Sequence, residues 1–101
     1  MIKSIVWSAV AKRNLKEIKR FYDLRNQNSE YSKKLLRVFK NAANLIERQP
    51  RIGKNTDKAG IKGLIVLNYI IFYEILHSHI LILMVWDCRR DPKQLEKFLL
   101  T

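Results

Sequence analysis

Residues 64 to 86 read LIVLNYIIFYEILHSHILILMVW, and this stretch decides the fold class. It contains three runs rich in Ile, Val, Phe and Tyr, the residue types that favour strands: Leu64–Leu67, Tyr69–Leu76 and Ile80–Trp86. Asn68 separates the first two runs, and His77-Ser78-His79 separates the last two. We therefore expect a meander of three antiparallel strands.

Upstream of this stretch, the sequence predicts a short strand and two helices. Ile2, Ile5, Val6 and Trp7 form a β-prone run, and Ser8 stands where a helix N-cap is needed. The first helix is expected to bury a stripe at helical spacing: Ala11, Leu15, Ile18, Phe21 or Tyr22, and Leu24.

A second helix is predicted after the polar break at residues 26–29, with Asn28 or Ser29 as its cap and with Pro50 and Gly53 at its end. Its expected apolar stripe is Tyr31, Leu35, Val38, Ala42 and Leu45. Because so few residues join the two helices, they should pack as an antiparallel hairpin.

The remaining segments complete a single domain over residues 1–101. Residues 51–60 have no apolar period and predict a loop. Asp91-Pro92 predicts the start of a short closing helix through Leu100. The order is strand, two helices, three strands and a helix, which makes an α+β domain: a small antiparallel sheet with the helix hairpin packed on one face.

The net charge points to an acidic partner. The chain has 20 Lys and Arg against 9 Asp and Glu, a formal charge of +11. Such a field favours a polyanion or an acidic protein. The candidate binding residues lie on the polar faces of the two helices: Lys12, Lys16, Lys19, Arg20, Lys33, Arg37 and Lys40. A solvated helix face is the alternative reading of that stripe.

The sequence favours a cytoplasmic protein without a metal or another cofactor. It has one cysteine, Cys88, which is expected to be a small packing residue, and no Cys and His set at zinc spacing. His77 and His79 lack a third ligand. The apolar stretch from residue 64 to residue 82 is interrupted by Asn68 and Glu74, so no membrane span is expected.

Arg89-Arg90 is the leading candidate for a functional contact, because both residues follow the most apolar strand and precede a capped helix. Arginine there can bind phosphate or carboxylate bidentately. Alternatively, one arginine pairs with Asp87 or Asp91 and closes the turn. Tyr69 joins the pair as a candidate target contact. Tyr69 and Tyr73 could stack on bases or pack in the core, and burial is expected for Tyr73.

The chain resembles the RelE/ParE superfamily of toxins from bacterial type II toxin-antitoxin systems, over nearly its whole length. The resemblance rests on residues 6–8 leading into the first helix, on residues 45–50 with Gly53, and on two more specific stretches, Asn68–Ile75 and Val85–Pro92. It implies a small sheet with a helix hairpin on one side, growth inhibition, and neutralisation by a cognate antitoxin protein.

The superfamily contains two activities. RelE-like members cleave messenger RNA on the ribosome and need lysines before the meander hairpin, an Arg after the next Tyr, an Arg after the last strand and a Tyr in the final helix. Here Leu64–Leu67 has no lysine and Ile70 follows Tyr69, so only Arg90 carries over. The sequence is therefore more similar to the ParE branch, whose members poison DNA gyrase by protein contact; an mRNA endoribonuclease is the alternative. A plain nucleic-acid-binding module would explain the charge but not the two motif stretches.

Overall fold

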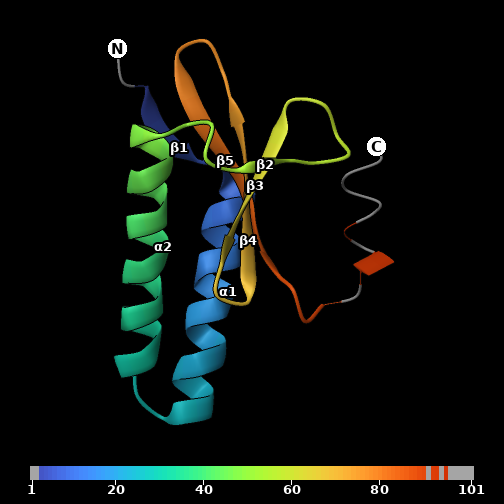
Figure 1. The fold of residues 1–101 in the computed structure, drawn as a ribbon. Coiled ribbons are helices and arrows are strands. Elements are labelled where there is room, and N and C mark those ends of the chain that lie inside the picture. The colour runs from blue at the N-terminus through green and yellow to red at the C-terminus, as the bar shows by residue number, and fades with distance from the viewer. Residues whose placement is uncertain (1–2, 91, 94, 96–101) are drawn as a thin grey trace.

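The strands and helices follow one another in the order that the sequence predicts, with one short strand added. The computed structural model describes residues 3–90, 92–93 and 95. Its elements are β1 (Ser4–Trp7), α1 (Ala9–Asn26), α2 (Glu30–Arg48), β2 (Lys54–Asn55), β3 (Ile61–Val66), β4 (Tyr69–Ile75) and β5 (His79–Asp87). The two helices stand side by side against one face of the sheet (Figure 1). The α+β class and the helix hairpin are thereby confirmed.

The sheet has the strand order β1-β5-β4-β3-β2. Strands β3, β4 and β5 form the expected antiparallel meander. The helix hairpin carries the chain from β1 at one edge of the sheet to β2 at the other edge. Strand β1 pairs with β5 in parallel, so the complete sheet is mixed. The loop expected over residues 51–60 contains the two-residue strand β2, which pairs with Lys62 and Gly63 of β3.

Helix α1 begins as predicted and buries a narrower stripe than predicted. The side chain of Ser8 accepts a hydrogen bond from the backbone N–H of Ala11, as an N-cap does. Tyr22 is buried, whereas Phe21 and Leu24 are exposed. Placing Leu24 on the buried stripe was wrong, because the last turns of α1 extend past the end of the sheet (Figure 1).

Helix α2 buries a stripe that differs in phase from the predicted one. Asn28 provides the cap, since its Oδ1 accepts from the backbone N–H of Glu30, while the Ser29 side chain makes no cap bond. The buried residues are Ser32, Leu35, Phe39, Ala42, Ala43 and Ile46, so Tyr31, Val38 and Leu45 are not on the innermost line. The hydroxyl of Ser32 bonds to Asp23 and to the Ser29 carbonyl oxygen, which satisfies this buried polar group.

The core lies between the hairpin and the sheet, with a smaller apolar cluster on the opposite sheet face. α1 packs on β5, and α2 packs over β1 and β3. The smaller cluster holds Ile61, Phe72 and Trp86, and Leu95 packs against it. Most of the closing helix predicted for residues 91–100 lies outside the described residues. In the described part of the chain, no helix has both the length and the apolar character that crossing a bilayer requires.

Candidate functional site

The two arginines that follow β5 are held differently, and Arg89 is the paired one. Its Nε donates to Oδ1 of Asp87 over 3.0 Å, and its Nη2 donates to Oδ2 over 3.0 Å. The backbone N–H of Arg89 also donates to Oδ1, at 2.9 Å. These hydrogen bonds lower the pKa of Asp87. The interpretation in which one arginine pairs with Asp87 and closes the turn therefore describes Arg89.

Arg90 projects its charge outward. Its guanidinium carbon lies 5.2 Å from the ring centroid of Trp86, a cation–π distance, and its backbone N–H donates to the Asp87 carbonyl oxygen at 3.0 Å. Within the described ranges its side chain makes no ion pair. The Arg90 side chain is exposed and available to a partner.

The Tyr22 hydroxyl links Arg89 to the helix hairpin. Nη2 of Arg89 donates to the Tyr22 hydroxyl over 3.1 Å. The Tyr69 hydroxyl bonds to the same group and lowers the pKa of Tyr22, and Arg89 lowers this pKa further. Burial raises the pKa of Tyr69, and its hydrogen bond to Tyr22 raises it again. Tyr22 is therefore bonded both to Tyr69 of β4 and to Arg89 after β5.

Helix α1 also fixes the course of β5 toward these arginines. The pairing of β4 with β5 shifts register after Phe72, and such a bulge leaves backbone groups of one strand without a ladder partner. Ser8 Oγ donates to the Leu83 carbonyl oxygen over 2.8 Å. Asn14 Oδ1 accepts from the backbone N–H of Val85 over 3.0 Å. Helix α1 and its N-cap residue thus hold the last residues of β5, including Asp87, in place.

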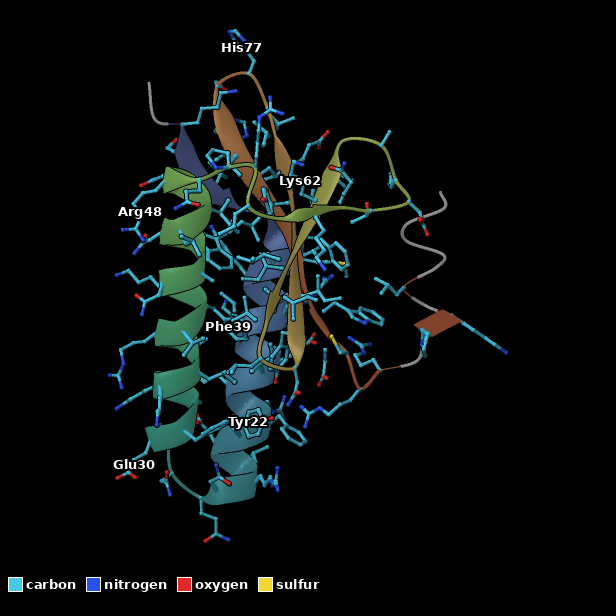
Figure 2. All side chains as sticks on the ribbon, viewed as in Figure 1. Tyr22, Glu30, Phe39, Arg48, Lys62 and His77 are labelled. Atoms are coloured by element: carbon cyan, nitrogen blue, oxygen red, sulfur yellow. The ribbon has the colours of Figure 1, made fainter. Side chains whose placement is uncertain are left out.

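A cleft of about 310 Å³ lies where α1 meets the end of β5. Its lining includes Glu17, Phe21 and Tyr22 from α1, Tyr69 from β4, and Asp87, Arg89 and Arg90 at the end of β5. The structure therefore brings all three candidate target contacts, Tyr69, Arg89 and Arg90, to one cleft. Glu17, Tyr22 and Asp87 were missed by sequence reasoning; Asp87 was considered only as a partner closing the turn. Tyr22 lies in the lower part of α1, toward the hairpin turn (Figure 2).

Tyr69 lines the cleft but is almost wholly buried. Its side chain is only 3% exposed, and the ring packs edge to face on Phe39 with centroids 5.1 Å apart. No ring face is open for a base to stack on. Tyr73 is fully buried as expected; its hydroxyl donates to the Pro50 carbonyl oxygen and accepts from the Gly53 N–H, both at 2.8 Å.

Four of the seven predicted basic contacts line one groove between the helices. These are Lys12, Lys16 and Lys19 of α1 and Lys40 of α2. The groove has a volume of about 470 Å³, and its apolar lining comes from Trp7, Leu15, Leu36 and Phe39. Lys19 also pairs with Asp23. Arg20, Lys33 and Arg37 are exposed outside this groove. The apolar lining was missed, because its residues come from three separate elements.

Cys88 is exposed, so its expected role in packing was wrong. Its backbone N–H donates to the Asn68 carbonyl oxygen over 2.8 Å. Partial burial of the thiol and the nearby Asp87 carboxylate raise its pKa, which makes it a poor nucleophile. Among the described residues, no group of three His, Cys, Asp or Glu side chains is placed to hold a metal ion.

Comparisons with known proteins identify the class of this chain. Its structure is similar to a solved chain described as the chromosomal ParDE TA system from P. aeruginosa, with a TM-score of 0.77, 16% sequence identity, and coverage of 85% of this chain and 96% of that chain. No curated protein matches the sequence significantly. A family model described as the ParE toxin of type II toxin-antitoxin system, parDE, matches residues 5–92. The chain is thus a type II toxin by class. It belongs to the ParE toxin family.

Proposed function

We propose that this chain inhibits an essential cytoplasmic target, DNA gyrase, by binding it, and that a cognate antitoxin neutralises it. The observation that carries the proposal is Arg90, an exposed guanidinium beside a cleft that also holds Arg89 and Tyr69, in a chain of the ParE family. A cation braced by an aromatic ring suits recognition of a carboxylate on a protein partner.

The positions of the lysines support inhibition by binding rather than RNA cleavage. If the chain were a ribonuclease, Arg90 would need a second cation, and Lys54, Lys58 and Lys62 are the candidates between α2 and β4. Lys62 pairs in register with Tyr73 of β4. Tyr73 lies four residues, or about 13 Å of strand, from Tyr69, which pairs with Asp87 at the end of β5. The Nζ of Lys62 also donates to Asn55 Oδ1 over 2.8 Å, away from that cleft.

The antitoxin is proposed to bind the lysine-lined groove between α1 and α2. An amphipathic helix with an acidic margin would place apolar side chains on Trp7, Leu15 and Leu36, and carboxylates beside the surrounding lysines. Groove and cleft use different flanks of α1: residues 12, 15, 16 and 19 line the groove, while residues 14, 17, 18 and 21 line the cleft. Neutralisation and target binding are therefore separable by mutation.

Purified toxin offered to two reactions tests the proposal. The first contains gyrase, ATP and relaxed plasmid, and the second contains ribosomes stalled on a message. We expect supercoiling to stop at near-stoichiometric toxin, because inhibition by binding does not turn over, and the message to stay intact. Arg90→Ala is the inactive comparison, and Arg37→Ala, an exposed arginine outside both cleft and groove, is the matched control.

Rapid message cutting with unaffected supercoiling would overturn the proposal and favour an endoribonuclease with Arg90 as a catalytic cation. Neutralisation is tested separately by adding the protein encoded beside the toxin gene. That protein should form a stable complex with the toxin and restore supercoiling. If it does not bind, the antitoxin part of the proposal fails while the target assignment stands.

A further inference from the structure

We propose that the projecting end of the helix hairpin is a contact surface for a folded protein that presents carboxylates around an apolar patch. We call this surface the hairpin tip and define it by Phe21, Leu24, Arg25, Tyr31 and Leu67. The inference rests on the proposed function, because it extends the contact with the target beyond the arginine cleft.

The hairpin tip leaves apolar side chains largely exposed in the part of the chain that the structure describes. The end of α1 and the start of α2 extend beyond the end of the sheet (Figure 1). Phe21 is 54% exposed, Leu24 68% and Tyr31 42%. Phe21 and Leu24 are neighbours on one helix face because they lie three residues apart. A small monomeric protein rarely gathers such groups at one end unless a partner covers them.

The turn between β3 and β4 adds an apolar residue in a conformation that disfavours it. Leu67 has φ 56° and is 64% exposed. Glycine or asparagine would occupy this left-handed position with less strain, and among the described residues Leu67 joins neither apolar cluster. The next residue, Asn68, lines a second cleft, together with Arg25 and Tyr31 of the helix hairpin. The strained turn and the hairpin therefore border the same surface.

The charges at this second cleft indicate the chemistry of the partner. The cleft has a volume of about 370 Å³, and its lining is Tyr22, Arg25, Asn26, Tyr31, Asn68 and Arg89. This described set contains two guanidinium groups and no carboxylate; Arg89 is paired with Asp87 from outside the set, so Arg25 supplies the positive charge for a partner. Phe21, Tyr22 and Tyr31 form a run of edge-to-face ring contacts, with centroids 4.9 Å and 4.7 Å apart. Aromatic residues with arginine are the composition of energetically dominant protein contacts.

A protein partner fits this surface better than a nucleic acid does. Phosphate recognition would use the cations but would leave Leu24 and Leu67 in water. A protein surface with apolar side chains inside an acidic margin would cover the leucines and pair with Arg25. The surface is continuous with the arginine cleft, since Phe21 lines that cleft and Tyr22 and Arg89 line both. One target face can therefore contact Arg90 and the hairpin tip together.

Leu24→Ser and Arg25→Ala test the hairpin tip, with Val10→Ser as the matched control. Val10 is an apolar residue in the first turn of the same helix and is 39% exposed. Truncating a dominant contact weakens affinity by about tenfold or more. We expect each tip variant to need at least about tenfold more toxin for half inhibition of gyrase supercoiling, and to lose growth arrest on induction. The Val10 variant should match the parent chain.

Thermal unfolding and antitoxin binding serve as the folding check, because Leu24 and Arg25 are exposed and lie outside the lysine-lined groove. Tip variants that fold, bind antitoxin and still inhibit like the parent chain would overturn the inference and leave the proposed function standing. If the parent chain arrests growth without inhibiting gyrase, the gyrase assignment fails, and loss of growth arrest in the tip variants would still support the surface. Loss of binding to double-stranded DNA, with growth arrest unchanged, would assign the surface to nucleic acid instead and overturn it.

Discussion

Nη2 of Arg89 lies 3.1 Å from the hydroxyl oxygen of Tyr22, and this hydrogen bond ties the segment after β5 to α1. The two residues are 67 positions apart in the chain. The same guanidinium holds the Asp87 carboxylate, so the turn that presents Arg90 is braced from two directions. Arg89 and Arg90 therefore have different roles: the first shapes the site, and the second is presented to a partner.

Tyr22→Phe should destabilise the protein by about 1–3 kcal/mol, because it removes the hydroxyl that bonds to both Tyr69 and Arg89. The measurement is the free energy of unfolding in urea. The double variant Tyr22→Phe/Tyr69→Phe should recover part of the loss, since it also removes the Tyr69 hydroxyl that Tyr22→Phe alone leaves unpaired. Tyr31→Phe is the control, because this exposed tyrosine contacts Tyr22 through its ring. Equal losses for Tyr31→Phe and Tyr22→Phe would contradict the assignment.

Arg90→Ala should abolish growth arrest with little change in the midpoint of thermal unfolding, because its exposed side chain makes no ion pair within the described ranges. Arg89→Ala should lower the midpoint, since it removes two bonds to Asp87 and one to Tyr22. The pair with Asp87 is half exposed, so we expect a cost of about 1 kcal/mol from that part. A large drop in midpoint for Arg90→Ala would show that it too is structural.

The end of β5 was predictable because the residues that mark it are neighbours in the sequence. The apolar run of residues 80–86 followed by two arginines defines a strand end with cations beside it, and the structure has that arrangement. The bond between Arg89 and Tyr22 was not predictable, because it depends on where α1 crosses β5. The phase of α2 was misjudged for a related reason: Ser32 is buried, and its polarity hid the stripe that contains Phe39 and Ile46. Its acceptor, Asp23, lies on the other helix.

The short strand β2 could not be read from the sequence either. Lys54 and Asn55 are poor strand formers, and their pairing with β3 follows from the preceding turn. That turn is held by Tyr73, whose hydroxyl bonds to the Pro50 carbonyl oxygen and the Gly53 N–H. A Cβ atom at Gly53 would lie 2.6 Å from the Tyr73 hydroxyl oxygen, which explains why glycine is needed there. Gly53 and Tyr73 are twenty residues apart, so their contact produces no pattern that could be recognised in the neighbouring sequence.

The stability of the protein should fall in acid partly through Asp87. Its carboxyl has a pKa lowered by the hydrogen bonds from Arg89, relative to an unfolded value of about 3.9. A lowered folded-state pKa stabilises the protein above the unfolded pKa, and this contribution is lost as the pH falls through the folded-state value. Asp87→Asn should therefore make the midpoint of thermal unfolding less dependent on pH below about pH 4. Parallel pH profiles for both proteins would exclude this role of Asp87.

Charge reversal in the lysine-lined groove should separate neutralisation from toxicity. Lys16→Glu places a carboxylate beside the apolar lining of the groove, where an acidic antitoxin segment is proposed to bind. Like charges across an interface cost several kcal/mol, so antitoxin affinity should fall by about a hundredfold or more. Growth arrest should persist even when antitoxin is co-expressed, because the arginine cleft lies on the other flank of α1.

The control is Lys33→Glu, which makes the same charge change on α2 outside the groove. Its antitoxin affinity, measured by calorimetry, should stay within a few-fold of the parent chain. An equal loss in both variants would mean that the antitoxin responds to net charge alone, and the groove would then not be its binding site.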